Sequence, residues 1–417
     1  MLKQVVAAAV IAGAGAAFAT PAQDIFDQAS FYVGFYYSGQ TKIPSWRELR
    51  QKFQPKLDAA CAGDANCSYE KAVPVIREMV ASLGDSFTNY MTLAEVEEME
   101  LRSAGQAPET PRLGILTATL PGVGEVITDV FEGEAAFAAD LKRGDLIRTV
   151  NGAPATKALL AGTGPMTLVI DRKGARQEVS VRPTVARQAP FLTSQRLPGD
   201  IFYIRIPDFY RMSPPPGGLT VSAEFARLVS AAVRANSKGL IVDVRDSYSG
   251  YDNEALAAAG SLVNQGSLTY RKRFPNSDEK LFIKDRKVWY QESGLDADAI
   301  ANLPATANTT LPVVVLVNKR TYNSSEMFAY WLQKAGRARV VGEPTAGELN
   351  VSGGYQTSWQ LLNEDFINLS LQSLYNDDGS LFPARVTPDV VIPEDLAALA
   401  AGNDQALTRA LELLGAR

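Results

Sequence analysis

Hydrophobic and polar positions follow two different periods in the first half of this 417-residue chain. From residue 24 to about residue 106, apolar positions recur every three or four residues, which predicts helices with one buried face. From residue 111 to residue 185, short β-branched runs alternate with glycine-bearing turns, which predicts strands. The pattern therefore predicts a helical N-terminal region followed by a strand-rich module.

The third region, residues 197–417, alternates the two signals. Its predicted elements are buried strands at 202–206, 239–244 and 313–317, and helices at 223–235 and 325–335. Alternating strands and helices favour an α/β core, and the more polar residues 266–310 are expected to form an insertion over it. The fold class we expect is multidomain, with α+β and α/β parts.

The N-terminus has the pattern of a secretory signal peptide over residues 1–19. Lys3 precedes a small, apolar run, and Ala17-Phe18-Ala19 fits the small-residue cleavage rule, so cleavage is expected before Thr20. An uncleaved anchor is the alternative, although the run is shorter than the roughly 20 residues of a membrane span. No later stretch is apolar enough to cross a membrane. We expect export to the periplasm or the extracellular space.

Cys61 and Cys67 are the only cysteines. They lie between two helix-like segments, where an oxidising compartment would let them form a disulfide across the turn. A redox or metal role is the weaker alternative, since a reactive pair normally has C-x-x-C spacing. A structural disulfide is the prediction.

The composition excludes several kinds of chemistry, because the chain contains no histidine. Triads with histidine, histidine-bearing zinc sites and imidazole pH switches are all excluded, so a catalytic base must be Lys, Asp, Glu or Tyr. The 41 basic and 46 acidic residues give a net charge of −5 without a long basic tract, which argues against nucleic acid as a partner. Neither a calcium loop nor a phosphate-binding lysine motif is found, and no cofactor is expected.

The strand-rich module resembles a PDZ domain of the bacterial protease-associated kind. Leu113, Gly114 and Ile115 are placed like a carboxylate-binding loop, and residues 132–152 look like the helix, Gly-Asp turn, strand and Asn-Gly turn of that family. The resemblance implies that an extended peptide adds to a sheet edge while backbone N–H groups hold its terminal carboxylate. The alternative is a small barrel that only spaces the other regions.

The outer regions resemble the C-terminal processing, or tail-specific, serine peptidases. The residues that carry this likeness follow the family's order along the chain, at 82–90, 202–209, 239–245, 340–347 and 386–392. The resemblance implies an α/β peptidase core in which a serine attacks the peptide bond and a buried, neutral lysine takes its proton. A branch of the family that uses histidine would place it at Phe87, so that variant is excluded.

The positions that correspond to this catalytic pair hold other residues. Counting from Glu326, which begins the next helix in the family pattern, places Asn323 at the nucleophile position. The lysine position, 25 residues further on, holds Glu348. Asn has no ionisable nucleophile, and a Glu would need strong desolvation to act as a base near neutral pH.

The oxyanion loop also departs from the family, because Ser249 precedes Gly250 where the family has two glycines. A positive φ would be costly at a serine, so we expect a reshaped loop. Ser324 is the alternative nucleophile, with Lys319 or Glu348 as its base. The opposing interpretation is that Ser324 and Ser325, or Asn323 itself, cap the following helix.

Three hypotheses follow. The first is an exported family member that binds polypeptide segments or C-termini and has lost or altered its hydrolytic site. The second is a working serine endopeptidase that uses Ser324. The third is an assembly subunit, which requires a blocked peptide groove in the PDZ-like module.

Overall fold

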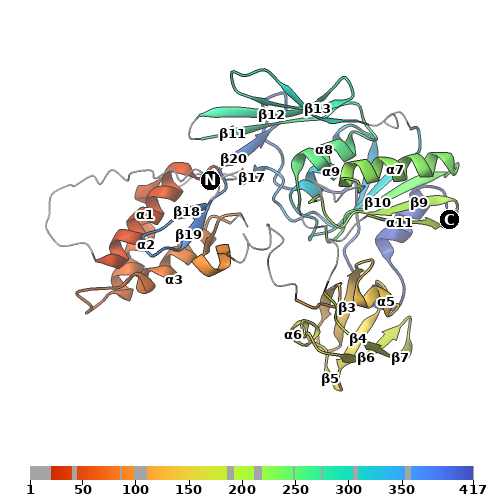
Figure 1. Ribbon diagram of the computed structural model, residues 1–417, viewed down its shortest axis with the longest axis horizontal. Coiled ribbons are helices and arrows are strands. Elements are labelled where there is room, and N and C mark those ends of the chain that lie inside the picture. Colours follow the sequence, from red (N-terminus) through yellow and green to blue (C-terminus); the bar gives the residue numbers. More distant parts are fainter. Residues whose placement is uncertain are drawn as a thin grey trace.

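The computed structural model describes residues 20–39, 45–84, 87–97, 110–185, 192–210, 218–247, 249–273, 276–303, 309–352 and 358–416. The predicted signal peptide, residues 1–19, lies outside the described residues. The fold is a mixed α/β multidomain arrangement with a helical N-terminal region and several β-sheets (Figure 1). Figure 1 shows the N-terminal helices at one end, the strand-rich module below and the core at the other end.

Three helices form most of the N-terminal region: α1 (Pro21–Tyr36), α2 (Trp46–Ala60) and α3 (Tyr69–Ala81). Thr20 and Ser45 cap the first two helices by accepting backbone N–H groups of the first turn. The predicted Cys61–Cys67 disulfide is present and joins the end of α2 to the segment before α3, with Cα atoms 5.5 Å apart.

The helical N-terminal region also pairs with a segment near the end of the chain. Its strand β1 (Asn89–Met91) pairs with β19 (Phe366–Asn368), and β18 (Ser358–Gln360) completes the small sheet. Leu361, Ile367 and Leu369 share the hydrophobic core of α1, α2 and α3. The periodicity could not reveal this pairing because its partners are more than 270 residues apart in sequence.

The strand-rich module forms a six-stranded antiparallel sheet in the order β2-β3-β4-β6-β7, with the short β5 paired to β4. Its elements are β2 (Ile115–Leu120), β3 (Gly124–Val130), α5 (Ala135–Ala138), β4 (Leu146–Val150), β5 (Ala153–Pro154), α6 (Lys157–Leu160), β6 (Met166–Arg172) and β7 (Ala175–Val181). Ile127, Ile147 and Leu168 lie in its buried core, as expected from the alternating pattern. The module is therefore a separate layer with its own core.

A six-stranded sheet forms the centre of the third region, in the order β21-β16-β15-β10-β9-β8. Its strands are β8 (Thr193–Leu197), β9 (Ile201–Arg205), β10 (Gly239–Asp243), β15 (Val313–Val317), β16 (Ala338–Gly342) and β21 (Val390–Val391). All neighbours are parallel except β8, which is antiparallel to β9. Parallel strands require covering on both faces, which explains why β10 and β15 are buried throughout.

Helices cover the two faces of this sheet. The core on one face includes residues of α7 (Val221–Arg234), α8 (Asp252–Ala259) and α9 (Ser324–Lys334). The core on the other face is formed with α11 (Gln405–Leu413). The predicted strand at 313–317 is confirmed residue for residue, and the predicted helices agree within two residues.

The predicted insertion over the core forms most of a second sheet. Its strand order is β14 (Asp298–Asn302), β13 (Lys287–Glu292), β12 (Ser277–Lys284), β11 (Ser267–Lys272), β20 (Gln372–Tyr375) and β17 (Val351–Ser352). Leu268, Leu281 and Val288 from this sheet belong to the same hydrophobic core as α8 and α9. The insertion is therefore packed into the third region.

The C-terminal segment connects the core with the strand-rich module. After β21 the chain forms α10 (Leu396–Ala400), and Leu399 packs against Val126 and Leu146 of the module. Gly144 lies so close to this helix that an added Cβ would approach the Leu399 carbonyl oxygen to 2.9 Å, and its φ of +92° also favours glycine. The module is therefore held against the third region by a short helix.

Candidate functional site

The turn between β15 and α9 carries the family nucleophile position. Asn323 is the N-cap residue of α9, so it is Asn323 and neither Ser324 nor Ser325 that occupies the capping position. Its φ of 45° and ψ of −110° lie in a sparsely populated region for a residue other than glycine. Strained strand-to-helix turns of this kind present nucleophiles at the carboxyl ends of parallel strands. The turn geometry is thus of a catalytic type, although its residue is an asparagine.

Hydrogen bonds hold the Asn323 amide on both sides. Its Nδ2 donates to the carbonyl oxygens of Glu348 at 3.2 Å and of Val351 at 3.3 Å. Its Oδ1 accepts a hydrogen bond from the Ser249 hydroxyl at 3.1 Å. The side chain is 5% exposed and connects three separate segments of the chain.

Glu326 fixes the same turn by accepting hydrogen bonds from its backbone. Its fully buried carboxylate accepts hydrogen bonds from the backbone N–H groups of Asn323, Gly347 and Glu348 at 2.8, 3.0 and 2.9 Å, and from the Thr345 hydroxyl at 2.5 Å. Burial raises the pKa of Glu326 to about 7, and these four donors oppose part of that rise. One carboxylate therefore fixes the start of α9 against residues 345–348.

Glu348 lies beside Asn323, as the spacing of 25 residues implied. Its backbone N–H contacts Glu326 and its carbonyl oxygen contacts the Asn323 amide. The residue is 7% exposed. The structure thus places side by side the two residues that the resemblance assigns to the catalytic pair.

Ser324, the alternative nucleophile, is completely buried. Its Oγ lies 2.7 Å from Asp252 Oδ1, 2.9 Å from the Gly250 carbonyl oxygen and 3.2 Å from Asn323 Oδ1. All three neighbours are acceptors, and a hydroxyl donates only one proton. The hydroxyl is therefore placed against a carbonyl oxygen of the oxyanion loop, where a nucleophile would need donors for the charge it creates.

Asp252 is a member of this site that the sequence analysis missed. It accepts hydrogen bonds from Ser324 and, at 2.6 Å, from the Tyr270 hydroxyl. Burial raises the pKa of the Asp252 carboxyl, while the two hydroxyl donors act in the opposite direction. In the sequence it looked like an ordinary acidic residue in the first turn of a helix.

Lys319 takes a different position from the one expected of a base for Ser324. Its side chain is 61% exposed and its Nζ lies 3.6 Å from Glu343 Oε1. The carboxyl group next to Ser324 is that of Asp252. The structure therefore brings together Asn323, Glu348, Ser324 and Ser249, and leaves Lys319 at the surface.

The oxyanion loop keeps a positive φ at both of its last residues. Ser249 has a φ of 52°, which is the left-handed region that we expected a serine to avoid. Its backbone N–H donates to the Tyr322 carbonyl oxygen at 3.3 Å. Gly250 has a φ of 144°, and an added Cβ would lie 2.4 Å from the Phe209 backbone, so glycine is required there. The backbone of the loop thus has positive φ angles of the kind that favour glycine, although one of the two residues is a serine.

In the module, Leu113, Gly114 and Ile115 lead into β2, which is the edge strand of the sheet. Gly114 has a φ of 77°, and an added Cβ would approach the Glu134 side chain to 2.4 Å. Glu134 forms an ion pair with Arg112, with Nε and Oε2 2.8 Å apart. Leu113 is buried in the module core, so the loop is anchored next to an exposed sheet edge.

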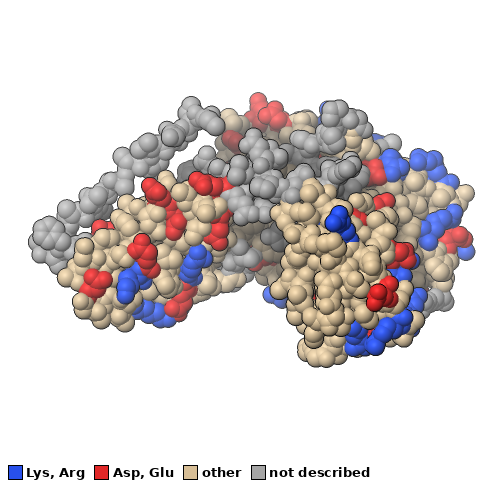
Figure 2. Space-filling view, turned by 60° about the horizontal axis from the view of Figure 1, so that its bottom comes forward, with Lys and Arg blue, Asp and Glu red and all other residues tan. Residues whose placement is uncertain are grey.

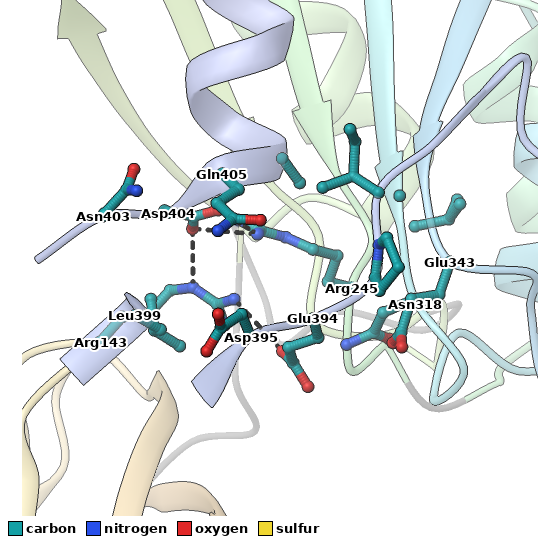
Figure 3. Close-up of a pocket in the computed structure, with 15 residues that line it drawn as sticks. Arg143, Arg245, Asn318, Glu343, Glu394, Asp395, Leu399, Asn403, Asp404 and Gln405 are labelled. Carbon is teal, nitrogen blue, oxygen red and sulfur yellow. Dashed lines mark hydrogen bonds and ion pairs between the residues drawn. The ribbon is translucent and has the colours of Figure 1, made fainter. Parts of the chain in front are cut away.

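A second polar site lies where the module meets the core, at the carboxyl ends of β10, β15 and β16 (Figure 3). Arg245 contacts Asp243 at 2.6 Å and Asp404 at 2.8 Å, and Arg143 of the module reaches Asp404 at 3.1 Å and Glu394 at 3.6 Å. We call these five residues the charge cluster. All of them except Asp243 line a pocket of about 340 Å³, including its open mouth, whose lining contains neither Asn323 nor Ser324.

The arginines of the charge cluster lower the pKa values of Asp404 and Asp243. Burial opposes the charge on Asp404, but the Arg245 and Arg143 guanidinium groups outweigh it and hold the pKa of that carboxyl well below its usual range. Burial also opposes the charge on Asp243, whose pKa is nevertheless lowered by Arg245. The cluster is therefore an ion-pair site in which each charge has a partner.

On the face shown in Figure 2, basic side chains lie among acidic ones. On the module, Arg148 and Arg176 both pair with Asp171, and Arg172 pairs with Asp145. No group of acidic or cysteine residues suited to a metal ion occurs in the part of the chain that the structure describes. Among the described helices, none has the length and apolar character needed to cross a membrane.

Comparisons with known proteins agree with this geometry. A profile of peptidase family S41 matches residues 200–392. The carboxyl-terminal-processing peptidase 2 of Arabidopsis thaliana chloroplasts is 25% identical over 342 residues, which cover 78% of this chain and 60% of that protein. The carboxy-terminal-processing protease of Bartonella bacilliformis is 24% identical over 343 residues, which cover 80% and 72% of the two chains.

The fold is also similar to a solved structure. The photosystem II D1 C-terminal processing protease superposes with a TM-score of 0.52 at 21% identity, covering 93% of this chain and 99% of that one. The similarity extends the agreement beyond the region of the family profile, to the N-terminal helices and the module. The chain is therefore a homologue of the peptidases of family S41, whose profile matches its α/β core.

Proposed function

We propose that this protein is an exported homologue of the tail-specific peptidases that binds polypeptide segments or C-termini and no longer hydrolyses them. One observation carries the proposal: the nucleophile position holds Asn323, whose amide is hydrogen-bonded to Glu348, Val351 and Ser249. A side chain that connects three segments in this way has a structural role, and it has no hydroxyl to activate.

The state of Ser324 supports the same proposal. A displaced nucleophile would have to reach a substrate carbonyl and transfer its proton to a base. Ser324 is buried, and its Oγ lies within hydrogen-bonding distance of three acceptors. Its contact with Asp252, whose pKa is raised, is the observation that favours the alternative of an active endopeptidase.

The module supports the polypeptide-binding part of the proposal. We infer that it acts as a PDZ-like domain, in which a peptide pairs with the free edge of β2 and its carboxylate meets the loop Leu113, Gly114 and Ile115. The edge position of β2 and the positive φ of Gly114 suit this arrangement. Export to the periplasm or the extracellular space fits the Cys61–Cys67 disulfide, which an oxidising compartment preserves.

The first test is hydrolysis. The mature protein is incubated with an unstructured polypeptide, and the products are analysed by mass spectrometry. The proposal expects no cleavage, in the parent and in Ser324→Ala alike. Reproducible cleavage that Ser324→Ala abolishes would establish the endopeptidase instead.

The second test restores the family pair with Asn323→Ser and Glu348→Lys. Because the structure places these two positions side by side, the double variant should acquire slow peptidase activity. Each single variant is the matched control and should remain inactive. An inactive double variant that is folded would show that the oxyanion loop, with Ser249, is also unsuited to catalysis.

The third test concerns the module. A peptide with a free C-terminus is titrated against the protein and compared with the same peptide amidated at its C-terminus. Carboxylate capture predicts clearly weaker binding of the amidated peptide, because a charged acceptor is lost. Equal affinities, or no binding of either peptide, would favour the assembly-subunit hypothesis.

A further inference from the structure

The backbone at Asn323 has a feature beyond its place in the family pattern. The ψ angle of −110° fixes where the next nitrogen lies. Because the substituents of a tetrahedral Cα are about 120° apart in projection, this ψ brings the Ser324 nitrogen to within about 10° of eclipsing the Asn323 Cβ. A five-membered ring through Cα, Cβ and Cγ of Asn323 and the Ser324 nitrogen needs this near-planar arrangement.

The attacking nitrogen is also favourably placed. Ser324 is the first residue of α9, so its N–H is one of the four that have no acceptor within the helix. The partial positive charge at a helix N-terminus stabilises negative charge that develops on this nitrogen when it loses its proton. The N–H therefore takes no part in the hydrogen bonds of the helix, and its deprotonation is favoured.

The side-chain amide of Asn323 is held as the electrophile. The Ser249 hydroxyl donates to Oδ1 at 3.1 Å, where negative charge accumulates when Cγ is attacked. Nδ2, the leaving nitrogen, is directed to the other side by its bonds to the carbonyl oxygens of Glu348 and Val351. Ser249 thus has the role that an oxyanion donor has toward a substrate, but it acts on the protein's own side chain.

We propose that Asn323 is a site of spontaneous succinimide formation in the folded protein. The Ser324 nitrogen bonds to Asn323 Cγ, the bond from Cγ to Nδ2 breaks, and the proton from the Ser324 N–H leaves with Nδ2 as ammonia. Water then opens the ring to aspartate or isoaspartate. The ψ angle of Asn323 is already close to that of the ring in the product, so the reaction needs little backbone rearrangement, which favours a fast intramolecular reaction.

The modification has a structural consequence. Asn323 Nδ2 is the donor that joins the turn to Glu348 and Val351, and an aspartate in its place is an acceptor only. Two carbonyl oxygens would then face a carboxylate, so the contact between α9 and β17 is weakened. Because Asn323 is 5% exposed, we expect the succinimide itself to accumulate before water opens it.

The test compares folded and unfolded protein. The mature protein is incubated at mildly alkaline pH with and without a denaturing concentration of urea, treated with hydroxylamine, which cleaves at succinimides, and mapped by mass spectrometry. The proposal expects modification at Asn323 to be about tenfold or more faster in the folded protein. A rate that is equal or slower in the folded protein overturns it.

Two controls accompany this comparison. Asn318 is equally buried at the other end of the same turn, and folding should slow its modification. Ser249→Gly restores the glycine of the family and tolerates the positive φ, but it removes the donor to Oδ1. It should slow the reaction at Asn323 about fivefold, the effect of one hydrogen bond. An unchanged rate in this variant would contradict the role given to Ser249.

Discussion

Two buried polar sites lie at the carboxyl ends of the same parallel sheet, and they are built from different interactions. Around Asn323, neutral donors converge on one amide and on the single carboxylate of Glu326. In the charge cluster, Arg245 and Arg143 are matched to Asp243, Glu394 and Asp404. The first site is held mainly by hydrogen bonds from neutral donors, whereas the second depends on full charges. The two should therefore respond differently to mutation, pH and salt.

The largest expected effect comes from removing one charge of the cluster. Arg245→Met keeps much of the side-chain volume but leaves buried carboxylates with fewer partners, and it should lower the free energy of unfolding by about 3 to 5 kcal/mol. Urea unfolding of the mature protein measures this change. The matched control is Arg176→Met, because this side chain is 66% exposed and its loss should change the free energy of unfolding far less. If both variants lost the same free energy of unfolding, burial would not be what makes the Arg245 ion pairs important for stability.

The pH dependence should separate the two sites. The pKa of Glu326 is about 7 in the folded protein and 4.5 without burial, so the folded state binds more protons between these values. Stability should therefore fall as the pH rises from about 4.5 to 7, by up to about 3 kcal/mol. The lowered pKa values of Asp243 and Asp404 act in the opposite direction, because stability is lost when the pH falls below about 4.

The measurement is urea unfolding of the parent protein and of Glu326→Gln between pH 5 and pH 8. Glutamine cannot ionise, so the variant should lose the decline in stability over this range. If stability declined equally in both proteins, the decline would come from titratable groups other than Glu326.

The smallest effects concern salt. Arg143→Met removes a partly exposed member of the cluster and should lower stability by about 1 kcal/mol at low ionic strength and by less at high ionic strength. Asn323→Gly tolerates the positive φ but loses the hydrogen bonds of the amide. It should lower the free energy of unfolding by a similar amount. Its effect should not change with salt because only neutral groups are removed. If the stability of both variants depended on salt in the same way, the two sites would not differ in the kind of interaction that holds them.

The sequence predicted local elements well and contacts between distant segments poorly. The run at 313–317 is entirely apolar and forms β15 with those limits, because a short buried strand needs no information from elsewhere in the chain. That Asn323 and Glu348 lie close together could be predicted only from the spacing seen in the resembling family. Without that resemblance, neither residue has a local signal that distinguishes it from a cap or a loop residue.

Asp252 and Ser249 show why the rest of the site could not be predicted. Asp252 contacts Ser324 across 72 residues of sequence, and its own segment resembles any helix with an acidic first turn. For Ser249 the expected cost of a positive φ was correct in principle. The fold nevertheless holds the residue at 52°, and its hydroxyl gains a partner in Asn323. In both cases, contacts between segments distant in sequence determine the position or conformation of the residue.

The pairing of β1 with β19 has a consequence for the order of folding. The core of α1, α2 and α3 includes Leu361, Ile367 and Leu369, so the first helices to be synthesised cannot cover all of their apolar surface until almost the whole chain is available. Contacts between segments so distant in sequence form slowly. A chain truncated before residue 358 should expose this surface and aggregate, whereas the strand-rich module, with its own core, has the local contacts to fold early.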